Sequence, residues 1–272
     1  MSVLLLRLAG PLQSWGSAAR FARRSTENAP TKSGVLGLLA AALGRGREAD
    51  LSDLAALRFG VRIDQPGSRL RDFHTAHHGD SGRAMPLSER FYLADAVFLA
   101  GVEGDSDLLH QLYKALLAPH FLPFLGRRSC PPARPVTIGP PQDITLEQAL
   151  RETAWQASGW YAQQSRARRG NASAPTSTPV LDILIDCPPA EEPDFSVRDV
   201  PLRFDPEHRQ YGLRGVRTGQ SQAPVAPCPS VTPPPVPPPH DPTHGLPLTD
   251  RTVGDPGPAP TPPPETGLPR IH

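Results

Sequence analysis

The sequence predicts an α+β protein with a ferredoxin-like order of elements, followed by a disordered tail. The spacing of apolar residues between positions 3 and 117 is typical of strand, helix, strand, strand and helix in that order, which begins a split βαβ unit. Of the 36 prolines, 18 fall between Gln220 and His272, where large apolar side chains are scarce. That stretch buries too little apolar surface to offset the ~1–2 kcal/mol per residue that an ordered backbone costs.

The first three elements follow from local patterns. Residues 3–8 form a short apolar run that ends at a Gly-Pro pair, which indicates a buried strand. Apolar positions within residues 35–43 recur at the spacing of one helix face, and Thr31 or Ser33 can cap the helix start. Residues 57–63 alternate between apolar and polar side chains. We therefore expect a strand with one solvated face there.

The next segments are an excursion, a strand and a helix. Residues 64–90 are polar and contain glycines, so we expect them to leave the sheet as a long excursion. Residues 91–100 are apolar on both faces apart from Asp95, which suits a central strand. Residues 105–117 have the pattern of a second helix. Its inward side chains are expected to be Leu108, Leu109, Leu112 and Leu116.

The rest of the folded part is expected to be smaller and rich in strands. Residues 145–148 match a capping box that opens a short helix, and residues 163–179 are polar enough to indicate a mobile loop. Residues 180–185 and 195–204 indicate further strands. The chain is thus divided into a core (1–135), a smaller β-rich part (136–218) and a disordered proline-rich tail (219–272).

The charge of the folded part is only mildly positive. Up to residue 218 it carries 26 basic and 23 acidic side chains, a net charge of +3, which does not by itself indicate a nucleic-acid-binding protein. Nearly all the cations are arginines, whose planar forks suit phosphates and base edges. A GC-rich genome explains the same bias, so composition alone does not establish that use.

Cysteine use and hydropathy exclude several classes of protein. Cys130, Cys187 and Cys228 lie far apart and form no CxxC pair, so neither a disulfide framework nor a cysteine zinc site is expected. Arg7 interrupts the apolar N-terminal run, and no other run approaches the length that spans a membrane. We expect a soluble cytoplasmic protein that holds neither a metal nor another cofactor.

Two clusters near the N-terminus could contact an anionic ligand. Residues 30–34 (PTKSG) place Lys32 at a helix start, where free backbone amides can bind a phosphate. The alternative is an ordinary capped helix whose glycines allow close packing. The other cluster lies within residues 10–24 and contributes Gln13, Trp15, Arg20, Arg23 and Arg24.

A third cluster opens and closes the excursion. Residues 70–78 contain His74, His77 and His78, which suggest either a metal site or a general base for RNA cleavage. A metal is the weaker interpretation, because no supporting set of ligands is visible in the sequence. The alternative for His74 is a histidine that hydrogen-bonds RNA or backbone without catalysis. Arg90 closes the excursion.

The fourth cluster is the loop over residues 124–132. It presents Arg127 and Arg128 between a glycine and a Pro-Pro pair, so the two guanidinium groups lie on a stiffened segment. The alternative is a solvated charge pair without a ligand. Cys130 is expected to be a small apolar side chain of the loop, because no activating partner identifies it as a nucleophile.

Five ordered segments together carry a family resemblance. They are residues 4–16 (LLLRLAGPLQSWG), 30–39 (PTKSGVLGLL), 70–75 (LRDFHT), 92–98 (YLADAVF) and 125–131 (LGRRSCP). In this order and spacing they resemble the CasD-type subunits of the subtype I-E CRISPR complex Cascade, which belong to the RAMP superfamily. Residues 204–217 look like the family's ending, whereas the tail has no counterpart in the family's pattern.

The resemblance implies an RRM-like, ferredoxin-type (RAMP) core with a protruding thumb at about residues 74–90. Family members cap the 5′ end of Cascade, hold the 5′ handle of the CRISPR RNA, and touch the backbone subunit and the large subunit. The implied role is non-catalytic and needs no cofactor. The candidate RNA-binding residues are Gln13, Trp15, Arg23, Arg24, Lys32, Ser33, Gly34, Arg71, His74, Arg90, Arg127 and Arg128.

Two other functions stay open at this point. Relatives in the I-C subtype cleave precursor CRISPR RNA without a metal, and His74 and Tyr92, with His77 and His78 nearby, are the residues that could serve here. The I-E motifs favour the non-catalytic role, because a separate subunit processes the RNA in those systems. A proline-tailed adaptor that uses PxxP segments rests on the tail alone.

Overall fold

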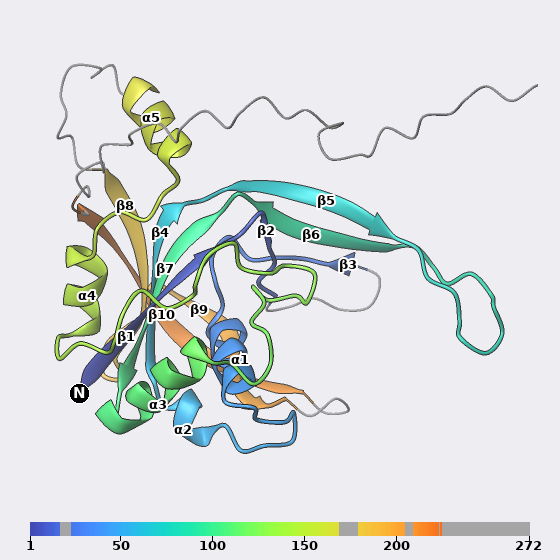
Figure 1. The fold of residues 1–272 in the computed structure, drawn as a ribbon, viewed down its shortest axis with the longest axis horizontal. Helices are drawn as coiled ribbons and strands as arrows, with labels where there is room; N and C mark the ends of the chain where they lie inside the picture. The colour runs from blue at the N-terminus through green and yellow to red at the C-terminus, as the bar shows by residue number, and fades with distance from the viewer. Residues whose placement is uncertain (17–22, 169–178, 205–208, 223, 225–272) are drawn as a thin grey trace, which may run out of the picture. The chain divides into compact units, whose positions relative to one another are not determined.

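The computed structural model describes residues 1–16, 23–168, 179–204, 209–222 and 224, and they form an α+β fold with mostly antiparallel sheets (Figure 1). The larger sheet has six strands in the order β1–β7–β4–β8–β10–β9. They are β1 (Ser2–Ala9), β7 (Val97–Gly104), β4 (Arg58–Gln65), β8 (Val180–Asp186), β10 (Gln210–Gln222) and β9 (Phe195–Arg203). The smaller sheet consists of β2 (Leu12–Gln13), β3 (Arg23–Arg24), β5 (Ser68–His74) and β6 (Ser88–Ala94).

Helices cover both faces of the larger sheet. They are α1 (Lys32–Ala42), α2 (Ser52–Ala55), α3 (Ser106–Leu117) and α4 (Leu146–Glu152). A further helix, α5 (Gly159–Arg168), follows α4 in the chain. Side chains of α1, α2 and α3 pack with alternate residues of β1, among them Leu4 and Leu6, in the main core. The residues between them, Val3 and Leu5, pack with α4 in a second core on the other face.

The predicted start of a ferredoxin-like fold is present. The chain passes in the order β1, α1, β4, β7, α3, and β7 lies between β1 and β4. A ferredoxin-like fold has a fourth strand on the outer edge of β1. Here residues 136–142 run beside that edge and make two isolated bridges, Val3 to Gln142 and Leu6 to Thr137.

The predicted helix starts depend on side-chain caps. Thr31 Oγ1 accepts a hydrogen bond from the Gly34 amide, and Thr145 accepts one from Gln148, as the sequence predicted. Asp105 caps α3 in the same way. The inward face of α3 is also confirmed, because Leu109 and Leu112 are fully buried while Leu108 and Leu116 pack against the core.

The expectation that residues 57–63 have one solvated face is wrong. Val61 and Arg62 point to opposite faces of β4, and both are buried. Arg62 is fully buried because its guanidinium group pairs with Asp64, at 2.7 and 2.9 Å, and donates to the carbonyls of residues 150, 153 and 154. The polar residues of this strand therefore point into a covered face.

The predicted strand over residues 91–100 is two strands in different sheets. Asp95 has a φ of 55°, a left-handed conformation that ends β6 before β7 begins at Val97. The excursion is correspondingly more regular than expected. Its flanks pair as β5 and β6, from Ser68 opposite Ala94 to His74 opposite Ser88. Figure 1 shows this hairpin projecting away from the larger sheet.

Two boundaries near the C-terminus also need correction. The loop predicted from residue 163 begins within α5, which continues to Arg168, and residues 169–178 lie outside the described residues. The tail was expected from residue 219, but β10 continues to Gln222, which pairs with Val180 of β8. Residues 225–272 lie outside the described residues. No helix within the described part is long and apolar enough to cross a membrane.

The new boundary predicts different effects for two truncations. A chain that ends at Pro224 should melt within a few degrees of the full chain, because the residues removed are poor in large apolar side chains. A chain that ends at Thr218 loses four pairing positions on β8 and the carbonyl of Pro224, which accepts from Trp155 N. It should be less stable by about 2 kcal/mol, or ~4–8 °C in melting temperature. Equal melting of both truncations would show that the end of β10 contributes nothing.

Candidate nucleic-acid interface

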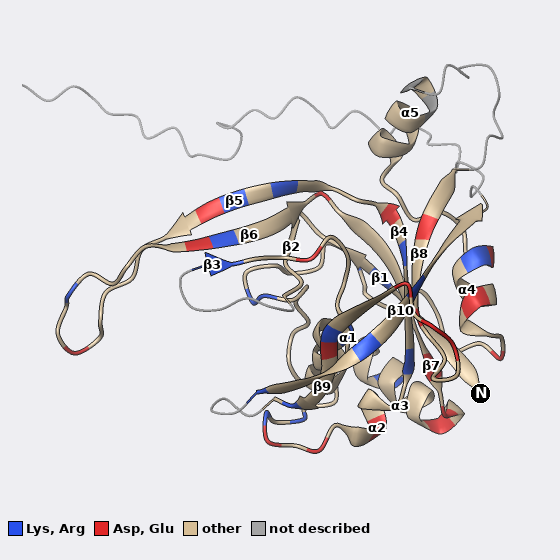
Figure 2. Ribbon diagram, turned by 180° about the vertical axis from the view of Figure 1, so that it is seen from behind, with Lys and Arg blue, Asp and Glu red and all other residues tan. Residues whose placement is uncertain are grey.

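The smaller sheet, called the hairpin sheet below, carries more net positive charge than the larger one. Strands β3, β5 and β6 carry five arginines against two carboxylates, which leaves a net charge of +3. Figure 2 shows these cations along the strands that project from the larger sheet. The arginines are Arg23, Arg24, Arg69, Arg71 and Arg90, and the carboxylates are Asp72 and Glu89.

Three arginines of this region stack on aromatic rings. The guanidinium carbons lie 5.3 Å from the Phe91 ring centre for Arg23, 4.6 Å from that of Phe73 for Arg71, and 4.9 Å from that of Tyr92 for Arg127. Phe73 itself is 50% exposed. Exposed guanidinium and aromatic planes are surfaces on which unpaired bases can stack.

One carboxylate serves two of these arginines. Glu89 lies 3.9 Å from Arg23 and also pairs with Arg71. Both arginine side chains are more than half exposed. Two cations that share one anion keep an excess positive charge, so the group can still attract a phosphate.

Arg24, Arg90 and Arg128 form a second row of cations. Arg90 of β6 lies opposite Asp72 of β5 and beside Arg24 of β3. Arg90 Nε is buried and has no hydrogen-bond partner among the described residues, and Arg24 is exposed. Arg128, on the loop after α3, is exposed as well. This row therefore has donors that the described part of the chain leaves unused.

Arg127 has a different position from its neighbour Arg128. Its guanidinium group is half-buried against Tyr92 and donates to the carbonyls of Phe91, at 3.2 Å, and Arg24, at 2.8 Å. It thus ties β6 to β3 and fixes the row of cations. The preceding Gly126 has a φ of 81° and packs directly on the carbonyl of Ser14.

The residues proposed for RNA cleavage do not come together. His74 lies near the far end of β5, where its Nε2 is 2.5 Å from Asp72 Oδ2. Tyr92 is buried and lies opposite Leu70, four residues back along β5, or about 13 Å. His77 and His78 are exposed beyond the end of β5. Among the described residues, no group of His, Cys, Asp or Glu has a metal-binding arrangement.

The expected phosphate seat at the start of α1 is occupied by the protein's own carboxylates. Asp199 accepts a hydrogen bond from the Lys32 amide at 2.7 Å, and Lys32 Nζ donates to Asp186 at 2.9 Å. Lys32 is only 5% exposed, and Ser33 is buried too. The structure therefore shows the alternative interpretation, an ordinary capped helix with close packing. We remove Lys32, Ser33 and Gly34 from the candidate RNA-binding residues.

Gln13 and Trp15 are likewise internal. The Gln13 amide donates to the carbonyls of Leu8 and Ala96, and its oxygen accepts from Trp15 Nε1 at 3.1 Å. Both side chains are fully buried, and the Trp15 ring packs against Gly34 so closely that an added Cβ would lie 2.8 Å away. These residues hold β2 to the main core. Arg20 lies outside the described residues.

Cys130 is the small apolar side chain that the sequence predicted. It is fully buried beside the main core, and burial raises the pKa of its thiol. A raised thiol pKa lowers the fraction of reactive thiolate at neutral pH. This favours a packing role for Cys130 over a nucleophilic one.

Three residues of the hairpin sheet were not predicted from the sequence as part of the interface: Arg69, Phe73 and Phe91. Arg69 donates to Asn28 Oδ1 and to the carbonyl of Thr26, which joins β5 to the segment before α1. Phe73 and Phe91 stack on arginines, as described above. Residues 69–73 (RLRDF) lack a clean apolar alternation, and the sequence predicts that the segment leaves the sheets, so no local signal identifies this pairing.

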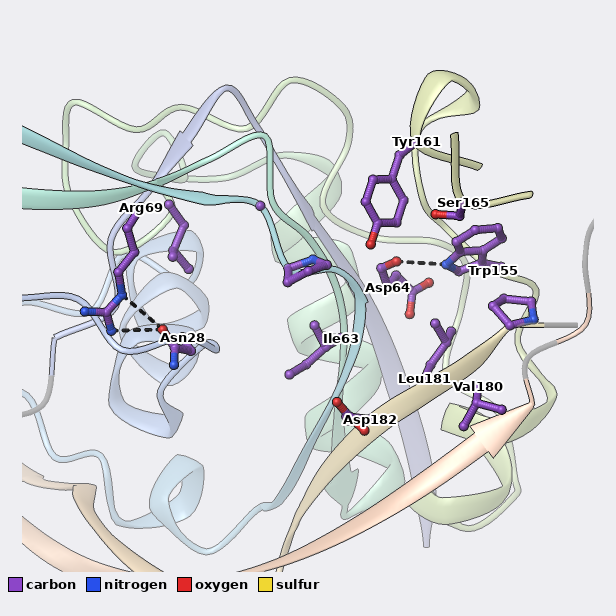
Figure 3. Close-up of a pocket in the computed structure, with 14 residues that line it drawn as sticks. Asn28, Ile63, Asp64, Arg69, Trp155, Tyr161, Ser165, Val180, Leu181 and Asp182 are labelled. Atoms are coloured by element: carbon purple, nitrogen blue, oxygen red, sulfur yellow. Dashed lines mark hydrogen bonds between the residues drawn. The ribbon is translucent and has the colours of Figure 1, made fainter. Parts of the chain in front are cut away.

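A cavity of about 420 Å³ lies beside the base of the hairpin, between α5, the end of β4 and the start of β8 (Figure 3). Trp155 and Tyr161 face it, and Trp155 Nε1 donates to the carbonyl of Asp64. Burial raises the pKa of the Asp64 carboxyl, although its partner Arg62 opposes the shift. None of the residues predicted to bind RNA lines this cavity.

Comparisons with known proteins agree with the resemblance seen in the sequence. A family model described as CRISPR-associated protein (Cas_Cas5) matches residues 3–217. The CRISPR system Cascade subunit CasD of Escherichia coli (strain K12) is 36% identical over 185 residues, which cover 60% of this chain and 82% of that protein.

Two solved structures are also similar. One, described as the crystal structure of a Cas protein, has a TM-score of 0.63 and 36% identity, with 83% of this chain and 99% of that chain covered. The other, from a CRISPR RNA-guided surveillance complex, has a TM-score of 0.65 and 30% identity, with 82% and 91% covered. The family match spans both sheets of the fold described above, and this chain belongs to the Cas5 family of CRISPR-associated proteins.

Proposed function

We propose that this protein is a non-catalytic, CRISPR RNA-binding subunit of a type I-E Cascade complex in the cytoplasm. It holds the 5′ handle of the CRISPR RNA and caps the complex that carries out antiviral defence. The observation that carries this proposal is the hairpin sheet, where arginines stacked on aromatic rings project from the body. The likeness to CasD of Escherichia coli supports the assignment to Cascade.

The two rows of cations suit two parts of a single-stranded RNA. Arg71 and Arg23, with Phe73 beside them, offer planes on which handle bases stack. Arg24 and Arg128 are exposed and have donors accessible to phosphates or base edges. The β5–β6 hairpin with its tip acts as the thumb, and it extends the segment expected at 74–90 back to Ser68.

Protein partners would meet apolar side chains on the same hairpin. Leu70, Phe73, Met85 and Leu87 are each between 42% and 51% exposed. Apolar groups concentrated on a projecting element are typical of a surface that is covered in an assembly. The neighbours expected here are the backbone subunit and the large subunit of Cascade.

The test is RNA binding by the complex reassembled with its other subunits. Arg24→Ala and Arg71→Ala should each weaken binding of the native handle by about 1–3 kcal/mol if the side chain reads a base, with little effect on a scrambled handle. A side chain that contacts only phosphate should weaken both RNAs alike. Arg47→Ala, at an exposed position in the loop after α1, is the matched control. Unchanged binding in both variants would show that the hairpin sheet is not the RNA surface.

The same preparation tests the alternative function, an endoribonuclease. Labelled precursor CRISPR RNA should stay intact, because the buried Tyr92 is too far from His74 to act with it. Cleavage at the repeat that disappears in His74→Ala would replace the non-catalytic role by a processing role.

A further inference from the structure

Arg7 is a charged residue in an otherwise apolar strand. It lies in the middle of β1 on the face that carries Val3 and Leu5, where α4 packs. Its own amide donates to the carbonyl of Val136 at 2.6 Å, and its side chain is half-buried. A guanidinium group in such a place needs partners for five N–H donors.

At least one of those donors is buried without a partner among the described residues. Arg7 Nε is buried without a hydrogen-bond acceptor among the described residues, and its NH1 reaches only Gln156 Oε1, at 3.4 Å. Within the same residues, neither Arg7 nor Arg134 takes part in an ion pair. Burial and then the charge of Arg134 lower the pKa of Arg7. The backbone bonds Ala133 N to Ala9 O and Arg7 N to Val136 O hold Arg134 beside the end of β1, so two like charges lie near each other without an ion-pair partner among the described residues.

Arg62 shows what a satisfied arginine on this face looks like. It lies across the sheet from Arg7, with Leu99 of β7 between them in register. Arg62 is fully buried but has a carboxylate, Asp64, bound through two nitrogens, and three backbone carbonyls besides. The difference between the two sites is an anion, which Arg62 obtains from within the chain and Arg7 does not.

The loop that carries Arg134 also connects this place to the hairpin sheet. It begins with Arg127 and Arg128 beside β3 and β6 and then runs back along β1. The Ala133 amide donates to the carbonyl of Ala9 at 2.9 Å, which fixes the loop next to the end of β1. Arginines therefore follow one loop from the hairpin sheet to Arg7.

We infer that Arg7 and Arg134 together bind one phosphate of the RNA backbone, so that the RNA continues from the hairpin sheet along this loop. The inference rests on the proposed function. The two non-bridging oxygens of a phosphodiester match the forked donors of guanidinium groups, which the half-buried Arg7 and the exposed Arg134 would supply. A carboxylate from a neighbouring subunit is the competing ligand, and the experiment separates the two.

The experiment measures RNA affinity against salt concentration in the reassembled complex. Arg134→Ala should weaken binding about tenfold, alike for native and scrambled sequences, and should flatten the slope of log affinity against log salt by roughly 0.7. Arg7→Gln should behave in the same way. Its free subunit should melt no lower than the wild type, because the substitution removes an unpaired charge beside Arg134. Arg151→Ala, an exposed arginine on α4 that covers the same face, is the control and should leave the slope unchanged.

The outcomes separate this inference from the function it rests on. If Arg24→Ala flattens the slope and Arg134→Ala does not, the phosphate site is overturned while the hairpin sheet remains the RNA surface. If neither variant changes the slope, both proposals fail. If Arg134→Ala prevents assembly of the protein subunits even without RNA, the ligand is a partner's carboxylate and the phosphate assignment is wrong.

Discussion

Asp199→Ala should destabilise the protein by about 3–5 kcal/mol. The Asp199 carboxylate is fully buried and binds the Arg214 guanidinium group through two nitrogens, each at 2.7 Å. It also accepts the Lys32 amide at the start of α1. Removing it leaves Asp186 as the one acidic partner of Arg214 among the described residues, and a buried charge deprived of a partner costs several kcal/mol.

Chemical denaturation of the purified subunit checks this value. Asp80→Ala, at an exposed position beyond the end of β5, is the matched control and should change the free energy of unfolding by less than about 0.5 kcal/mol. If Asp199→Ala were as mild as the control, the contacts among α1, β9 and β10 would not depend on this carboxylate. The buried charges would then be far better solvated than their exposures indicate.

Gly126→Ala should destabilise the protein to a similar degree. We expect the free energy of unfolding to fall by about 3 kcal/mol or more, or the protein not to fold. The left-handed φ of 81° alone costs an alanine roughly 1–2 kcal/mol. In addition, the new Cβ would lie 1.8 Å from the carbonyl oxygen of Ser14, so the backbone must move. That movement displaces Arg127, which ties β3 to β6.

Two measurements test the Gly126→Ala prediction. Thermal melting reports stability, and RNA affinity of the assembled complex should fall with it, because the cation row next to Arg127 loses its support. Gly139→Ala is the control, since a Cβ there meets nothing within 4 Å. A Gly126→Ala protein with normal melting would mean that the loop has room to shift, and normal RNA binding would show that the position of Arg127 is not needed.

Local signals in the sequence were sufficient for most of the regular elements of the core. Helices α1 and α4 could be placed because Thr31 and Thr145 cap them within three residues of the amides they satisfy, and α3 because its leucines recur at the spacing of one helix face. Strand β10 was not predicted. Its sequence, QYGLRGVRTGQSQ, lacks a clear apolar alternation, and the strand exists because β8 and β9 pair with it on either side.

The sequence could not predict which of the candidate cations are exposed to solvent. The sequence makes both Lys32 and Arg24 candidates for RNA binding, yet of these two only Arg24 is exposed. The difference comes from Asp186 and Asp199, which lie more than 150 positions along the chain from Lys32. Pairings of that separation depend on the register of β8 and β9 in the sheet, which no local pattern specifies.

The segment beside β1 has a consequence for how this subunit avoids unwanted association. An apolar strand with a free edge invites a strand from another copy, which leads to open-ended aggregation. Here residues 136–142 take hydrogen bonds along that edge, for example between Val3 and Gln142 in both directions. Pro140 and Pro141 in the same segment have no amide to offer outward. The edge of β1 is thus closed by a segment in which two residues lack an amide, and this disfavours pairing with a strand from another copy.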